Sequence, residues 1–167
     1  MRGILVCALV LVASAADAEV FAHVRSGQPA IRGWLAEGYE RSATFKALVD
    51  EIDTLPGIVY IETGTVMRPG LDGALLHTVA GSRESPLLRV VVRWSLTRAT
   101  GIATIAHELQ HVVEVLRAGE VTDSSAMTAL FESIGKTQPR GASQFETEAA
   151  REVTLRVLDE LAQRSKR

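Results

Sequence analysis

The chain contains very little cysteine, few aromatic residues and no excess of basic charge. Its 167 residues include one cysteine, Cys7, and 5% Phe, Trp and Tyr. Internal disulfides are therefore excluded, the core must be mainly aliphatic, and any bound metal must use histidine and carboxylate ligands. Lys and Arg (18) nearly balance Asp and Glu (20). This balance gives no reason to expect nucleic acid as a main partner.

The first 18 residues have the pattern of a secretory signal peptide. A positively charged start precedes an apolar run at residues 4–13 and an A-x-A cleavage pattern at 16–18. Residues 14–16 offer a second cleavage site, and an uncleaved anchor is the alternative. The apolar run is too short for a permanent transmembrane helix. We therefore expect an exported, periplasmic or secreted domain over residues 19–167, without a stable membrane span after cleavage.

Hydrophobic spacing divides the remaining chain into helices, then strands, then helices. Two helices are predicted over 31–39 and 44–53, the second capped by Ser42. Short β-branched runs between turn residues predict strands over 58–62, 73–79 and 87–94. Further helices are predicted over 97–118, 124–134 and 144–162. With no repeat or linker, the order favours one α+β domain in which a small antiparallel sheet packs on helices.

The helix predicted over 97–118 carries an HExxH sequence, with histidines at His107 and His111 and a glutamate at Glu108. Residues four apart share one helix face, so both imidazoles can reach one metal ion while Glu108 is turned to hold the attacking water. An apolar stripe anchors another side of the helix, formed by Ile102, Ile105, Leu109, Val112 and Leu116. The motif predicts a zinc site with Glu108 as the catalytic base.

This motif resembles that of the zincin metallopeptidases. Metzincins place Gly three residues and His six residues after the second histidine, and here these positions hold Glu114 and Arg117. The gluzincin branch instead takes a glutamate from a later helix as the third ligand. The Phe-Glu-x-x-Ala segment at 145–149 looks like the corresponding element of M48-type peptidases. The resemblance implies a zincin-like fold and a site that binds Zn²⁺.

Two glutamates are candidates for the third zinc ligand. On a helical wheel Glu146 clusters with the core-facing alanines and valines, whereas Glu148 falls on the solvent side, so we assign Glu146. The aspartate of the M48-type pattern falls on Ala150, so a usual partner for a ligand histidine is missing. Glu148 with Glu152 is the thermolysin-like alternative. A capping box between Ser143 and Glu146 competes with ligation by Glu146.

Two further histidines and one tyrosine lie outside these motifs. His77 and His23 have no spacing partner and are more simply structural or solvated, although His77 could donate a hydrogen bond to an oxyanion. Tyr60 is a similar candidate for that role. The strand over 87–94 reads most simply as core sheet. A functional interpretation is that one edge of this sheet accepts an extended peptide by main-chain pairing.

The resemblance implies an exported zinc-dependent metallopeptidase that cleaves peptide or protein substrates. His107, His111 and Glu146 would bind zinc, and Glu108 would move the proton. The alternative is a non-catalytic exported domain that binds zinc or a partner, which the small size and Ala150 favour. Against it stands Glu108, because structural zinc sites use four protein ligands and have no need of a base. A metal-free helical adaptor is the third possibility.

Overall fold

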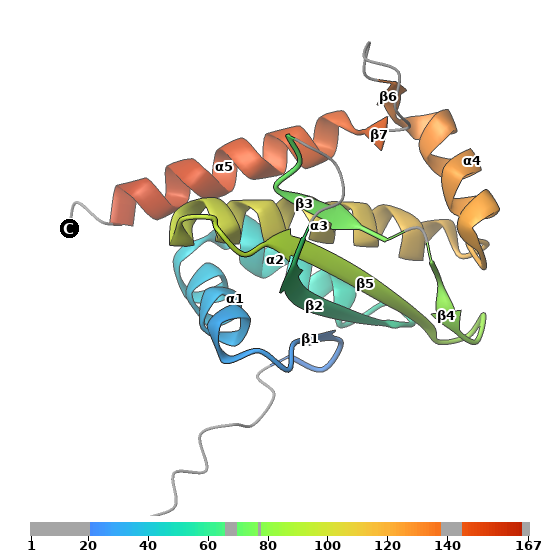
Figure 1. The fold of residues 1–167 in the computed structure, drawn as a ribbon, viewed down its shortest axis with the longest axis horizontal. Coiled ribbons are helices and arrows are strands. Elements are labelled where there is room, and N and C mark those ends of the chain that lie inside the picture. The colour runs from blue at the N-terminus through green and yellow to red at the C-terminus, as the bar shows by residue number, and fades with distance from the viewer. Residues whose placement is uncertain (1–20, 66–69, 77, 138–144, 165–167) are drawn as a thin grey trace, which may run out of the picture.

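The computed structural model describes residues 21–65, 70–76, 78–137 and 145–164, and the predicted signal peptide lies outside these ranges. Its elements are β1 (Val24–Arg25), α1 (Pro29–Arg41), α2 (Ala43–Ile52), β2 (Ile58–Gly64), β3 (Gly73–Leu75), β4 (Ala80–Gly81), β5 (Pro86–Arg93), α3 (Arg98–Ala118), α4 (Ser124–Ile134), β6 (Lys136–Thr137), β7 (Phe145–Glu146) and α5 (Glu148–Arg164) (Figure 1). The fold is α+β, as the order of predicted elements indicates.

The main sheet is mixed, so the prediction of an antiparallel sheet is wrong. Its strand order is β1-β2-β5-β3, with β4 also paired to β5. β1, β2 and β5 run parallel, whereas β3 and β4 are antiparallel to β5. β2 does not pair with the next strand in the chain, because β5 lies between β2 and β3. The connection over 65–85 is long enough for such a parallel crossover, which short turns alone would not allow.

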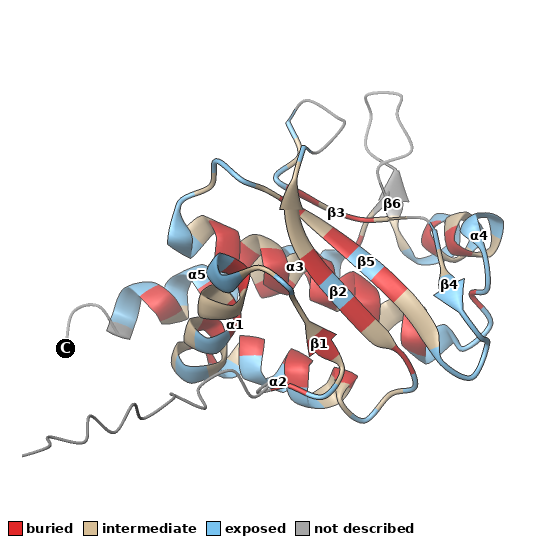
Figure 2. Ribbon diagram, turned by 60° about the horizontal axis from the view of Figure 1, so that its bottom comes forward, coloured by how far each residue is buried: buried red, intermediate tan, exposed pale blue. Residues whose placement is uncertain are grey.

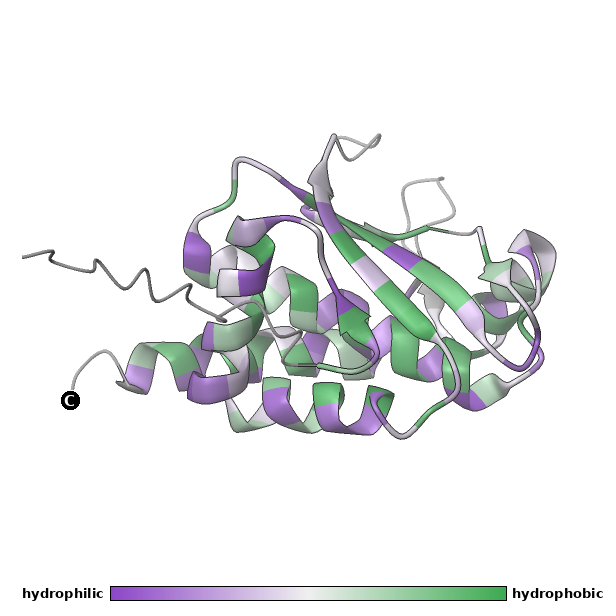
Figure 3. Ribbon diagram, turned by 90° about the horizontal axis from the view of Figure 1, so that it is seen from below, coloured by the Kyte–Doolittle hydropathy of each residue, from purple (hydrophilic) through white to green (hydrophobic). Residues whose placement is uncertain are grey.

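The helices lie on one side of the main sheet (Figures 2 and 3). On β5, Leu88, Val90 and Val92 are fully buried, whereas Arg89 between them is exposed. This period of two is expected for a sheet with one covered face. The alternation fixes the register, since a slip of one residue would bury Arg89.

α3 is the central helix and lies against β3 and β5 on one side and α2 and α5 on the other. Thr97 caps its start, and Gly119, at φ 67°, ends it in a left-handed conformation that glycine adopts without strain. The predicted apolar stripe of this helix is buried throughout. Within the ranges that the structure describes, no helix has the length and apolar character needed to cross a membrane.

Local capping signals predict several helix bounds, but the start of α5 is later than expected. The Ser42 hydroxyl accepts a hydrogen bond from the Phe45 N–H at 2.9 Å, so the predicted cap of α2 is confirmed. α4 has its predicted bounds. α5 begins only at Glu148, where the Thr147 hydroxyl accepts from the Ala150 N–H at 3.2 Å. The strand predicted over 73–79 is also shorter, and its first three residues form β3.

Candidate metal centre

α3 brings the imidazoles of His107 and His111 together. Their Nε2 atoms lie 3.2 Å apart, and the ring planes meet at 81°. Two nitrogen ligands at about 2.0–2.1 Å from a tetrahedral zinc ion would be separated by about 3.3 Å. The two rings therefore already have the spacing of a pair of zinc ligands.

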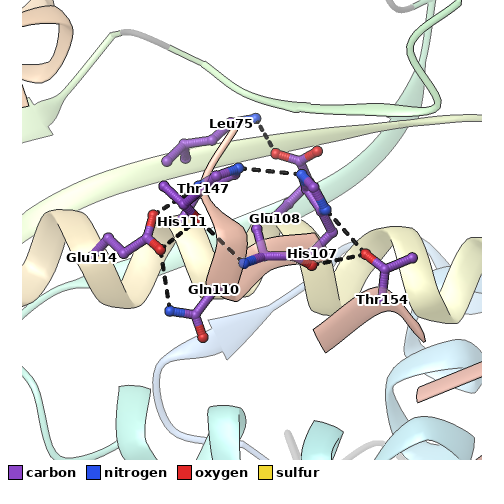
Figure 4. Close-up of polar contacts among 9 residues, drawn as sticks. Leu75, His107, Glu108, Gln110, His111, Glu114, Thr147 and Thr154 are labelled. Carbon is purple, nitrogen blue, oxygen red and sulfur yellow. Dashed lines mark hydrogen bonds and ion pairs between the residues drawn. The ribbon is translucent and has the colours of Figure 1, made fainter. Parts of the chain in front are cut away.

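The other nitrogen of each ring has a hydrogen-bond acceptor as its partner (Figure 4). His107 Nδ1 lies 3.0 Å from the Thr154 hydroxyl, which donates its own proton to the Ala150 carbonyl. His111 Nδ1 lies 2.8 Å from Oε2 of Glu114. Because Thr154 has no second proton to give and a carboxylate only accepts, both Nδ1 atoms must be the donors. Such partners orient ligand histidines in metal proteins.

Because each Nδ1 donates, rings that carry a single hydrogen present both Nε2 atoms as acceptors, and these two atoms face each other. Two such acceptors at 3.2 Å repel unless a proton on one ring or a metal ion lies between them. Burial, followed by the neighbouring His111, lowers the pKa of His107 to about 4, so the His107 ring is neutral at pH 7. The donor geometry of the imidazole pair thus fits a divalent metal ion such as Zn²⁺.

Glu108 is buried between α3 and β3. Its carboxylate accepts a hydrogen bond from the Leu75 N–H at 2.7 Å. Burial raises the pKa of Glu108 to about 7, against the opposing effects of His111 and of that N–H. β3 can approach this closely because residue 73 is glycine: a Cβ at Gly73 would lie 2.6 Å from Thr104 and 3.0 Å from the Glu108 carboxylate. A buried carboxylate beside two histidines is typical of a functional site.

β3 is an edge strand of the sheet, and its outer backbone groups adjoin Glu108. The Leu76 N–H donates to the Arg89 carbonyl of β5 at 2.9 Å. Backbone groups alternate along an antiparallel strand, so Gly73 and Leu75 turn theirs away from β5. The Leu75 N–H on that outer side is the one that Glu108 accepts. Glu108 therefore adjoins the edge strand of the sheet, as that sheet is formed by the described residues.

The structure does not bring the predicted third ligand to the imidazole pair. Glu146 lies in β7, before the cap of α5, with its carboxylate 3.7 Å from Arg151 Nε. Glu148 is exposed at the first turn of α5. Among the described residues, no three His, Cys, Asp or Glu side chains are grouped so as to hold a metal ion. The helical-wheel argument for Glu146 assumed a helix from residue 144, which is wrong, because α5 begins at Glu148. The assignment of Glu146 as the third ligand stays a prediction.

The remaining sequence candidates within the described residues, His23 and Tyr60, do not join this site. His77 and Ser143 lie outside the described residues. His23 is structural, with its Nδ1 at 3.2 Å from the Ile52 carbonyl. Tyr60 is exposed in β2, next to buried residues that face the helices, and so lies on the opposite face of the sheet.

Sequence reasoning missed Thr154 and Glu114, the two residues that hold the imidazoles. Glu114 lies three residues after His111, a spacing at which side chains on a helix are in contact. This spacing alone predicts the hydrogen bond between Glu114 and His111. Thr154 comes from α5 and depends on tertiary docking. Thr154 and Glu114 accept hydrogen bonds from both Nδ1 atoms. They therefore take the part that an aspartate at position 150 would have as a partner of a histidine.

Comparison with known proteins adds no family. No protein-family model matches the chain, and no curated protein or solved structure matches it either. The resemblance to zincins therefore depends on the HExxH motif and the Phe-Glu-x-x-Ala segment of the sequence.

Proposed function

We propose that the protein is an exported zinc-dependent metallopeptidase of the zincin type. The observation that carries this proposal is the imidazole pair, whose Nε2 atoms face each other 3.2 Å apart next to the buried Glu108. A structural role for the two histidines would not require their lone pairs to face each other. A metal site does require it.

Each side chain then has a distinct part in peptide hydrolysis. His107 and His111 would hold the metal, which would supply polarisation of the substrate carbonyl and of a water molecule. Glu108 would accept the proton of the attacking water and deliver it to the leaving amine. The Leu75 N–H holds the Glu108 carboxylate in position between these steps. Glu146 remains the proposed third ligand.

The substrate is proposed to be a peptide in extended conformation. An added strand could pair with the outer N–H and C=O of Gly73 and with the Leu75 carbonyl, beside the Leu75 N–H that Glu108 accepts. This pairing would recognise main-chain atoms and leave side-chain preference to the surrounding residues. It would place a peptide carbonyl close to the imidazole pair.

The substitution Glu108→Gln tests the proposed function. Glutamine has the same shape and can still accept from the Leu75 N–H, but it cannot take up a proton. We expect zinc to bind with unchanged stoichiometry while hydrolysis of casein falls about 10²- to 10⁴-fold. Equal rates in the two proteins would remove Glu108 from the mechanism. Stoichiometric zinc without any hydrolysis by the unsubstituted protein would reject the peptidase.

A non-catalytic zinc-binding domain is the second candidate. It is favoured by the lack of a grouped third ligand among the described residues and by the hydrogen bond that already occupies Glu108. The two candidates differ in whether the metal keeps an open coordination position. A peptide hydroxamate should bind the zinc-loaded peptidase and should not bind a zinc ion closed by four protein ligands.

A further inference from the structure

Glu114 connects the imidazole pair to the start of α5. Its Oε2 accepts from His111 Nδ1 at 2.8 Å, and its Oε1 accepts from the Thr147 hydroxyl at 2.8 Å and from Gln110 Nε2 at 3.3 Å. Thr147 is buried, and its hydroxyl also accepts from the Ala150 N–H as the cap of α5. A continuous series of hydrogen bonds thus runs from a proposed zinc ligand to the first turn of another helix.

We propose that Glu114 is the positioning residue of the metal centre and that, through Thr147, it makes zinc binding depend on the docking of α5 against α3. This inference rests on the proposed function, because it takes the imidazole pair as the zinc site. Glu114 touches neither metal nor substrate, and acts through His111.

The two Nδ1 partners contribute differently. Thr154 holds His107 through a neutral hydroxyl, which fixes which ring nitrogen carries the hydrogen but adds no charge. Glu114 likewise keeps the hydrogen of His111 on Nδ1. It also places a negative charge next to the ring, which makes the Nε2 lone pair a stronger ligand for a cation. Glu114 is also largely buried, with 12% of its side chain exposed, so solvent weakens this effect little. We therefore expect Glu114 to be the more important partner.

The Thr147 contact extends the effect to α5. If the first turn of α5 leaves α3, Glu114 loses one of its two short hydrogen bonds and is free to rotate away from His111. Conversely, zinc on the imidazole pair restrains His111, then Glu114, and then the α5 cap. Zinc should therefore slow amide exchange at residues 148–151 as well as at the histidines.

Zinc affinity, measured by competition with a chromophoric chelator, tests the positioning role. We expect about a 10- to 100-fold loss for Glu114→Ala. Glu114→Gln keeps an acceptor for His111 without the charge and should lose less. Thr147→Val removes the link to α5 and should lose affinity, whereas Thr147→Ser keeps the hydroxyl and should recover it. Glu160→Gln, a carboxylate change near the other end of α5, is the matched control and should keep full affinity.

A second readout needs no metal. Nitrogen NMR of the metal-free protein should show the His111 hydrogen on Nδ1, and Glu114→Ala should move a fraction of it to Nε2. A merely structural Glu114 would leave this distribution unchanged, and that result would overturn the proposal, as would wild-type zinc affinity in Glu114→Ala. If the unsubstituted protein binds no zinc, the proposed function fails, while the NMR comparison still decides whether Glu114 positions His111.

Discussion

α5 is held by carboxylates at both ends, and the two attachments differ in one respect. We call His107, His111, Glu114, Thr147 and Thr154 the imidazole end of α5. We call Ser42, Thr44 and Glu160 the cap end, because Ser42 is the cap of the neighbouring helix α2. At the cap end the Glu160 carboxylate accepts from both hydroxyls and from the Thr44 N–H, so each of these donors meets an acceptor. At the imidazole end two Nε2 atoms face each other, and both are acceptors when each ring carries a single hydrogen.

This difference separates a structural network from a binding site. A polar network whose members all have complementary partners stabilises the packing of helices and needs nothing further. Facing acceptors are unfavourable in the protein alone, and such local conflicts concentrate at functional positions. We therefore propose that a metal ion completes the imidazole end, whereas the cap end needs none.

The largest expected effect is the loss of zinc on substitution of His111. His111→Ala removes one of the two Nε2 donors, and the remaining ring cannot hold zinc by itself. We expect elemental analysis after dialysis to find no zinc in His111→Ala and one zinc ion per chain in the unsubstituted protein. His23→Ala is the matched control and should keep its zinc, because His23 contacts the Ile52 carbonyl instead. One zinc ion per chain in His111→Ala would show that the imidazole pair is not the zinc site. The imidazole end would then be a structural network, like the cap end.

An intermediate effect is expected at the close contact between β3 and α3. Gly73→Ala places a methyl group 2.6 Å from Thr104 and 3.0 Å from Glu108, so β3 must shift. We expect a loss of about 1–3 kcal/mol in the free energy of unfolding, measured by urea denaturation. Gly27→Ala has no atom within 4 Å of the added carbon and should change stability by less than about 0.5 kcal/mol. Equal stabilities of the two variants would contradict the close packing of this strand on Glu108.

Features set by local chemistry were predictable from the sequence. Ser42 caps α2 as expected, Asp123 caps α4 and Gly119 ends α3, because each acts on backbone groups within a few residues. The apolar stripe of α3 follows from the helical period. Strand pairing was not predictable in the same way. The position of β5 between β2 and β3 depends on contacts across the sheet. The turn residues of the sequence do not predict which strands form these contacts.

The candidate site divides in the same manner. The spacing of His107 and His111 on one helix sets their approach, and the sequence shows it directly. Thr154 could not be assigned, because its contact with His107 requires α5 to be docked on α3. The wheel argument for Glu146 failed because the cap at Thr147 starts the helix after it, and only the folded chain shows which of several capping residues is used.

The smallest expected effect concerns the cap end and its dependence on pH. Burial raises the pKa of Glu160, but hydrogen bonds from Ser42 and Thr44 outweigh it, so the pKa of this carboxyl lies below its ordinary value. A carboxyl whose pKa is lower in the folded state stabilises the protein above the pKa of the unfolded chain, about 4.3, and loses that contribution as the pH falls through the folded pKa. At pH 7 we expect Glu160→Gln to be less stable than the metal-free unsubstituted protein by about 1 kcal/mol in urea denaturation. This gap should narrow below about pH 4, where the glutamate is protonated and resembles glutamine. A gap independent of pH would show that the charge of Glu160 contributes nothing, and a fall in zinc affinity at pH 7 would show that the two ends of α5 are not independent.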